Sequence, residues 1–194
     1  MKGEPHSVAF VRNLLIAFIP AVALGLAFND EIEALLENAV VVAWALIIGG
    51  IGILVVEKLA KTRDVGGISG VTTGQSVKIG LVQCIAMIPG VSRSGATIMG
   101  AMALGIDRRT AAEFSFFLAL PTLTGATVLQ MVKHRDAITA NDLQLIGVGA
   151  FVSFIVALVV VKAFMAVVTK HGFAPFAWYR IVAGALALVM VNFR

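Results

Sequence analysis

The sequence predicts an all-α integral membrane protein, a polytopic helical bundle with a re-entrant helical hairpin at about residues 76–105. The composition, several long apolar runs and one broken apolar region lead to this fold class. Of the 194 residues, 59% are hydrophobic and 13% are charged, and the mean hydropathy is +0.97. Soluble domains carry about a quarter charged residues. The composition therefore excludes an ordinary soluble protein.

Five apolar runs have the length of a spanning helix, about 20 residues. They lie at about residues 9–28, 39–56, 112–132, 143–169 and 174–193. The first run follows a positively charged start, which is also typical of a signal peptide. It is long enough to span, however, and no clear cleavage site precedes the next polar stretch. We interpret it as the first membrane helix.

Residues 76–105 differ from these runs. Two shorter apolar pieces, each too short to cross a bilayer, are separated by Pro89, Gly90 and the Ser-Arg-Ser-Gly sequence at 92–95. A hairpin that enters and leaves on one side of the membrane fits these lengths best. Broken backbone is tolerated at membrane depth only where protein surrounds it or water reaches it. Residues 62–74, which are rich in Gly and Thr, read as a flexible connector to this hairpin.

The distribution of charges predicts the topology, because Lys and Arg accumulate in cytoplasmic loops. The segments predicted to lie inside are the N-terminus, residues 57–64, Arg108, Arg109 and Lys170. The segments predicted to lie outside are the acidic loop 29–38 with Glu31, Glu33 and Glu37, residues 133–142, and the C-terminus. Charge does not distinguish a re-entrant hairpin from two full crossings, but it argues against a single crossing. No domain boundary or repeat is visible, so residues 1–194 are predicted to form a single transmembrane domain.

The other charge and ligand patterns are weak. The net charge of +4 fits basic residues that flank inner helix ends, and no basic stripe with interleaved aromatics predicts a nucleic-acid partner. Cys84 is the single cysteine, which excludes an internal disulfide, and it reads as a small buried residue. His6, His134 and His171 are far apart and have no metal-ligand spacing.

Arg93 is the unusual residue, because an arginine inside a membrane is costly and rare unless it is paired. The sequence after it predicts a helix whose first turn contains Gly95 and Thr97. Free backbone N–H groups, the hydroxyls of Ser92, Ser94 and Thr97, and the guanidinium then share a small volume, and Gly95 lets the backbone approach a ligand. Helix N-termini and arginine forks both bind phosphate. The pattern predicts an anion site. In the alternative interpretation, the serines cap the helix and Arg93 pairs with carbonyls or an interfacial lipid.

Other candidate residues have simpler interpretations. Thr110 to Glu113, "TAAE", has the spacing of a capping box, which favours helix capping over catalysis for Glu113. Gln83 shortly precedes the hairpin tip and can face a cavity there. Tyr179 and Arg180 read as an interfacial aromatic anchor and its positive flank.

Three segments, "VQCIAMIPGVSRSGATI", "EFSFFLALPTLTGAT" and "PFAWYR", resemble the bacterial undecaprenyl pyrophosphate phosphatase family, which is also known for bacitracin resistance. The resemblance implies a membrane hydrolase that removes the terminal phosphate of undecaprenyl pyrophosphate and recycles the lipid carrier of cell-wall peptidoglycan synthesis. Ser92, Arg93, Ser94 and Thr97 match the family motif, and their implied role is to bind and polarise the pyrophosphate. Gly95 completes this phosphate-binding set, and Arg93 and Ser92 are the expected catalytic residues.

The resemblance also implies a location and partners. It places the protein in the bacterial inner (plasma) membrane as a multi-pass protein, with the active site at the tip of one of two inverted re-entrant hairpins and facing the periplasm. The implied partner is a polyprenyl pyrophosphate lipid, and a homodimer is left open. A divalent cation, Mg or Ca, is implied as a cofactor, although we identify no ligands for it and no metal site in this chain.

The sequence departs from the family in one respect. The family's other hairpin carries an E-x-x-x-E run and a P-V-S-S-T-G-H segment that complete the active site, and neither occurs here. We therefore expect the chain to be the C-terminal part of a longer family fold. Two alternatives remain for its function: a transporter or flippase of a phosphorylated lipid or anion, and an inactive fragment.

Overall fold

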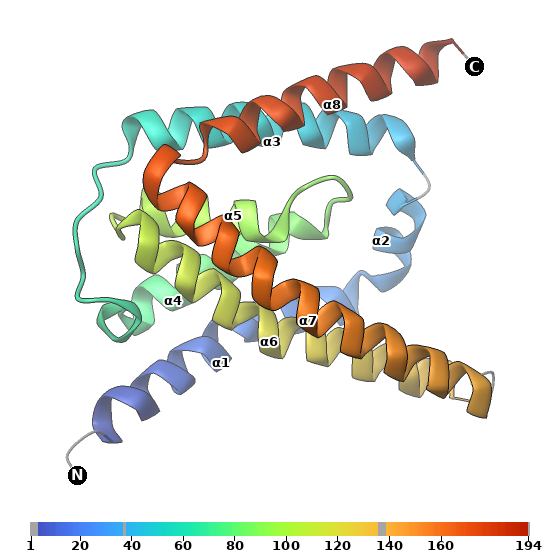
Figure 1. Cartoon of the computed structure of the whole chain (residues 1–194), viewed down its shortest axis with the longest axis horizontal. Coiled ribbons are helices and arrows are strands. Elements are labelled where there is room, and N and C mark those ends of the chain that lie inside the picture. Colours follow the sequence, from blue (N-terminus) through green and yellow to red (C-terminus); the bar gives the residue numbers. More distant parts are fainter. Residues whose placement is uncertain (1–3, 37, 136–138, 194) are drawn as a thin grey trace.

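The chain is helical almost throughout residues 4–36, 38–135 and 139–193, which the computed structural model describes (Figure 1). The α-helices are α1 (Glu4–Ala27), α2 (Asn29–Leu36), α3 (Ala39–Leu59), α4 (Thr73–Gln83), α5 (Arg93–Ala103), α6 (Arg108–Lys133), α7 (Ala140–His171) and α8 (Ala174–Asn192). Two short 3₁₀ helices, η1 (Ile68–Gly70) and η2 (Cys84–Met87), complete the set. In these ranges the β-type pairing is one isolated bridge between Arg63 and Ile106. The predicted all-α fold class is confirmed.

Among the described residues, five helices are long and apolar enough to cross a membrane. Their apolar stretches are Val8–Ala27, Ala39–Leu59, Arg108–Lys133, Asp142–His171 and Ala174–Asn192. All five predicted runs fall on these stretches, so the protein is a multi-pass helical membrane protein. Helix α7 is the longest, with 32 residues, and its side chains from 143 to 163 are all exposed. Figure 1 shows α7 running obliquely to the neighbouring pair α3 and α8.

The broken hairpin predicted for about residues 76–105 consists of α4, η2, a turn and α5. Its two α-helices have 11 residues each, too few to cross a bilayer. The first helix begins at Thr73 because Thr72 and Gln75 form a capping box, with each side chain accepting a hydrogen bond from the other residue's backbone N–H. The turn contains Gly90, whose φ of +88° suits glycine. A Cβ there would come within 2.5 Å of the Val42 carbonyl oxygen, so the turn lies directly against α3.

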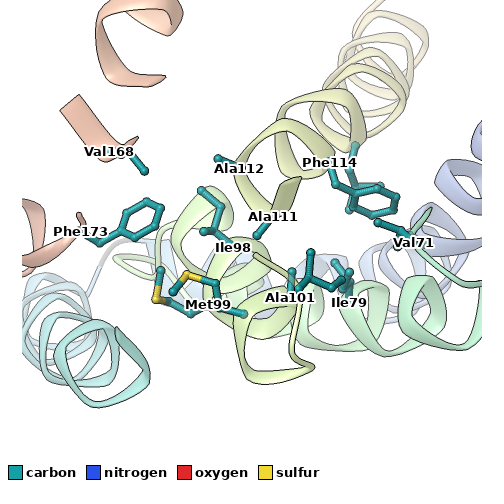
Figure 2. Close-up of a cluster of buried hydrophobic side chains, with 14 of the residues drawn as sticks. Val71, Ile79, Ile98, Met99, Ala101, Ala111, Ala112, Phe114, Val168 and Phe173 are labelled. Atoms are coloured by element: carbon teal, nitrogen blue, oxygen red, sulfur yellow. The ribbon is translucent and has the colours of Figure 1, made fainter. Parts of the chain in front are cut away.

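The hairpin is held in the bundle by an apolar core (Figure 2). Ile79 of α4, Ile98 of α5 and Phe114 of α6 are at most 1% exposed and belong to one buried cluster. Figure 2 shows this cluster extending to Val168 and Phe173 near the α7–α8 turn. Most other large apolar side chains lie on the outside of the bundle. The contacts within this buried cluster therefore hold the hairpin in place.

Segments that the charge pattern assigns to one side of the membrane meet at one end of the bundle. The Glu57 carboxylate at the end of α3 forms a 2.8 Å ion pair with Arg108 at the start of α6. It also accepts hydrogen bonds from the Phe173 backbone N–H in the α7–α8 turn, at 2.9 and 3.0 Å. Figure 1 shows α2 and the C-terminal end of α8 at the opposite end. This grouping agrees with the topology predicted from the charges.

Two local predictions are wrong. The acidic segment read as a loop forms a short helix, α2, where Glu31 is exposed, while the side chain of Glu33 and all of Glu37 lie outside the described part. The capping box at Thr110–Glu113 does not form. Asp107 caps α6 instead, accepting from the Thr110 N–H at 2.9 Å, so the helix begins earlier, at Arg108.

Candidate functional site

Ser92 determines where α5 begins at the hairpin tip, which comprises residues 88–96. Its backbone is extended, with φ −69° and ψ 121°, and its Oγ accepts a hydrogen bond from the Gly95 N–H at 3.0 Å. This is the geometry of an N-cap, so α5 begins at Arg93, two residues before the predicted first turn. The Ser94 Oγ lies 3.2 Å from the Ser92 Oγ. Two hydroxyls therefore stand together at the positive end of the α5 dipole.

Arg93 points from the tip toward α6. Its side chain is half-buried, and Nη1 donates to the Ser115 carbonyl oxygen at 3.0 Å. A guanidinium has five N–H donors, so this bond occupies one of them. The contact agrees with the interpretation in which Arg93 pairs with a carbonyl. It also directs the guanidinium toward α6, and Arg93 lines neither of the two cavities described below.

Thr97 is fully buried, whereas the other predicted phosphate ligands are partly exposed. Its Oγ1 lies 2.5 Å from the Oγ of Ser115 and also donates to the Arg93 and Ser94 carbonyl oxygens. In this arrangement Thr97 joins α5 to α6. The sequence reading missed Ser115 as its partner. A lone serine among the phenylalanines of "EFSFF" was the available signal.

Two cavities meet at the tip. The larger, about 640 Å³, lies between α3 and the hairpin, and Ser92 and Arg180 bring polar side chains to a lining of mostly apolar residues. The smaller, about 210 Å³, is lined by Ser92, Ser94 and Gly95 together with residues of α7 and α8, including Tyr179 and Arg180. Ser92, Gly95 and Arg180 line both cavities. The N-terminus of α5 therefore faces open space on this side.

The predicted role of Arg180, a positive flank at the membrane interface, is wrong. Tyr179 is exposed, as an interfacial anchor would be, but Arg180 is half-buried within α8. Its Nη2 donates to the carbonyl oxygens of Gly90 at 3.0 Å and Ala45 at 3.3 Å. Arg180 is thus a contact of the hairpin tip and not a positive flank. An arginine inside an apolar spanning run was the signal for such a role.

Comparison with known proteins identifies the family of this chain. A family model described as bacitracin resistance protein BacA matches residues 2–186. The chain belongs to this family. The resemblance seen in the sequence is thereby confirmed.

Curated relatives match the BacA-family chain along all or nearly all of its length. The undecaprenyl-diphosphatase of Novosphingobium aromaticivorans is 58% identical over 198 aligned residues, and that of Sphingopyxis alaskensis is 52% identical over 194. Both matches cover 100% of this chain and 73% of the relative. The undecaprenyl-diphosphatase 2 of Paramagnetospirillum magneticum is 47% identical, covering 98% of this chain and 73% of the relative. The shared part includes the whole hairpin.

Other predicted candidates of the BacA-family chain lie away from the two cavities. Gln83 is 2% exposed and lines neither cavity, and its side-chain amide makes no hydrogen bond among the described residues. Glu113 pairs with Arg109 at 2.9 Å on the surface of α6. The thiol of Cys84, the first residue of η2, donates to the Gly80 carbonyl oxygen of the preceding helix α4 at 3.3 Å. These three side chains therefore have no described contact with the tip.

The residues at the tip do not fit a divalent cation. Mg²⁺ and Ca²⁺ prefer carboxylate and carbonyl oxygens, whereas the tip presents hydroxyls and guanidinium groups. Within residues 4–36, 38–135 and 139–193, no three His, Cys, Asp or Glu side chains come close enough to hold a metal. His134 and His171 are exposed at separate helix ends, and the side chain of His6 is not described.

Proposed function

We propose that this BacA-family chain is an undecaprenyl-diphosphatase, which hydrolyses undecaprenyl pyrophosphate to undecaprenyl phosphate and phosphate. The observation that carries the proposal is the capped N-terminus of α5, which faces two cavities at the tip of a broken membrane hairpin. The names and the 47–58% identities of the relatives support the same substrate. The activity recycles the lipid carrier of cell-wall synthesis.

The tip suits a pyrophosphate. The first backbone N–H groups of a helix and its dipole attract anions, and here the hydroxyls of Ser92 and Ser94 lie beside them. Arg93 lines neither cavity, but its bond to Ser115 occupies only Nη1 and leaves its other N–H donors for phosphate oxygens. Gly95 adds no side chain between backbone and ligand. The larger cavity, with its apolar lining, accepts the adjoining part of the isoprenoid chain.

Arg93 and Ser92 then act by positioning and by stabilising charge. Phosphoryl transfer depends mainly on these two effects, because negative charge spreads over the oxygens of the transferred group. A serine becomes a strong nucleophile when a base adjoins it, and no histidine or carboxylate of the described residues hydrogen-bonds to Ser92 or Ser94. We therefore assign to these residues the binding of phosphate and not the activation of water. Thr97 supports them by fixing α5.

We place the protein in the inner membrane with the tip opening toward the periplasm. The hairpin begins and ends at the end of the bundle where Arg108 and the α7–α8 turn meet Glu57. The basic segments gather at this end, which makes it the cytoplasmic end under the positive-inside rule. The carbonyl oxygen of Ala45 accepts a hydrogen bond from Arg180, which also binds the Gly90 carbonyl oxygen at the tip. Ala45 lies 14 residues before Leu59, which is about 21 Å along α3. That is more than half of a hydrocarbon core of about 30 Å. A homodimer stays a prediction.

The experiment is phosphate release from undecaprenyl pyrophosphate by the purified chain in detergent. Phosphate release by the unsubstituted chain supports hydrolysis, and Arg93→Ala is expected to lower kcat/KM by about a hundredfold or more, as loss of a charge-stabilising donor does. Arg109→Ala, which removes an exposed ion pair on α6, is the control and is expected to keep its rate. Full activity in Arg93→Ala would overturn the role of Arg93.

A transporter or flippase of a phosphorylated lipid is the second candidate. One observation favours it: half-helix N-termini in broken membrane helices also hold anionic substrates in transporters. Reconstituted vesicles that move the lipid between leaflets without releasing phosphate would support this function and contradict hydrolysis. Vesicles that do neither would support the inactive-fragment alternative.

A further inference from the structure

Arg180 lies well inside the membrane-spanning part of α8, where an ionised side chain requires a partner. The helix that carries it is packed tightly on α3. A Cβ on Gly50 would come within 2.8 Å of the Ala177 carbonyl oxygen, and one on Gly184 within 2.7 Å of the Ala43 carbonyl oxygen. Such close backbone contact leaves α8 a fixed support for Arg180.

The arginine reaches the hairpin tip across a gap left by a glycine. Gly49 of α3 has no side chain, and a Cβ there would lie 2.5 Å from Nη2 of Arg180. The same Nη2 donates to the carbonyl oxygens of Ala45 and Gly90. Gly90 is itself pressed against Val42. One guanidinium therefore joins three elements: α8, α3 and the turn of the hairpin.

The turn joined in this way leads directly into the phosphate-facing groups. Gly90 precedes Ser92, the N-cap of α5, by two residues. On the opposite side, Arg93 joins the same tip to Ser115 of α6. The tip is thus held between two arginines. Of the two, Arg180 lines both cavities beside Ser92.

We propose that Arg180 is a positioning residue of the phosphate-binding tip. By holding the Gly90 carbonyl against α3, it orients Ser92 and the first N–H groups of α5 toward the two cavities. The binding of pyrophosphate at the tip rests on the proposed function. The restraint exerted by Arg180 on the tip does not depend on it, and the two can be tested separately.

The test is hydrogen–deuterium exchange of the full chain in detergent, followed in peptides that cover residues 88–96. Arg180→Met removes both hydrogen bonds, and exchange in these peptides is expected to rise by about tenfold or more, since bonds from charged donors are strong. Arg180→Lys keeps a cation that can reach one carbonyl, so it is expected to restore part of the protection.

Gly49→Ala provides a second perturbation that leaves the arginine in place, in case Arg180→Met does not fold. Its new methyl group displaces Nη2 from the tip, so exchange at 88–96 is expected to rise here too. Gly52→Ala is the matched control for exchange, because a Cβ at that position of the same helix meets no atom within 4 Å. Its tip peptides are expected to exchange at the rate of the unsubstituted chain.

Phosphate release by the same variants separates the two proposals. A fall in kcat in Arg180→Met, partly restored by Arg180→Lys and accompanied by faster exchange, supports positioning. Faster exchange in a chain that never releases phosphate supports positioning and contradicts the proposed hydrolysis. Unchanged exchange at 88–96 in folded Arg180→Met and Gly49→Ala, with or without loss of activity, overturns positioning by Arg180.

Discussion

Glu57 and Arg108, 51 residues apart in the chain, form a 2.8 Å ion pair that joins the end of α3 to the start of α6. The same carboxylate accepts the Phe173 backbone N–H in the α7–α8 turn. The Glu57 side chain is 15% exposed and that of Arg108 is 37% exposed, so water screens the pair only in part. One carboxylate therefore holds three segments together at this end of the bundle.

Replacing Glu57 is expected to destabilise the fold. Glu57→Ala removes the ion pair and the acceptor for Phe173, at a cost of about 1–3 kcal/mol after allowance for solvent screening. Glu57→Gln keeps an amide oxygen for the Phe173 N–H and is expected to cost less. The measurement is thermal unfolding in detergent. Glu113→Gln, in the exposed pair with Arg109, is the comparison and is expected to change little.

The hydroxyls of Thr97 and Ser115 are expected to act as a pair. Thr97→Val keeps the shape of the side chain but removes its hydroxyl, which costs about 1–2 kcal/mol of unfolding free energy because the Ser115 hydroxyl stays buried. Ser115→Ala is expected to cost less, since Thr97 keeps its bonds to the carbonyl oxygens of α5.

A double-mutant cycle measures this coupling. The double variant Thr97→Val, Ser115→Ala is expected to be more stable than the sum of the single changes predicts. Strict additivity would mean that the two hydroxyls do not interact.

The packing of α8 on α3 is expected to be sensitive to a single methyl group. Gly184→Ala would place its Cβ 2.7 Å from a backbone oxygen of α3, so the helices must move apart, at a cost of about 1–3 kcal/mol. Gly147→Ala in α7 has open space around its Cβ and is expected to be neutral or slightly stabilising. Unfolding temperatures of the two variants in one detergent provide the comparison, and equal values would contradict the close contact.

Arg93→Lys is expected to separate the structural role of this residue from its role in binding. A lysine can still donate to the Ser115 carbonyl oxygen, but it has no planar fork for phosphate oxygens. Stability is expected to stay near that of the unsubstituted chain, while kcat/KM for undecaprenyl pyrophosphate falls about ten- to a hundredfold. Equal losses of activity and stability would indicate that Arg93 serves only to hold the tip.

Much of the fold could be predicted because each spanning helix is a long and predominantly apolar run. The hairpin was also predictable, since Pro89, Gly90 and Arg93 interrupt an apolar region at a length that cannot cross a bilayer. Helix starts were less certain. Asp107 and Thr110 are both good caps, and the choice between them depends on where the chain turns after α5.

The site was harder to predict because its contacts join residues distant in sequence. Ser92 to Gly95 form a local motif and lie together at the tip as expected. Thr97 is directed away from that surface by Ser115, 18 residues later, and Arg180 reaches Gly90 from 90 residues away. No local pattern contains either relationship. Both follow only once α6 and α8 are packed against the hairpin.

Helix α7, with 32 residues, is longer than the hydrocarbon core of a lipid bilayer is thick. A helix of that length measures about 48 Å, whereas a hydrocarbon core measures about 30 Å. The excess is accommodated by tilt or by extension beyond the core at the helix ends, one of which carries Lys170 and His171 in its last turn. Since α7 ends at the turn bound by Glu57, we expect a change in its tilt to be transmitted to the end of the bundle from which the hairpin enters. A thicker or thinner membrane is therefore expected to exert a mechanical load on the protein through α7.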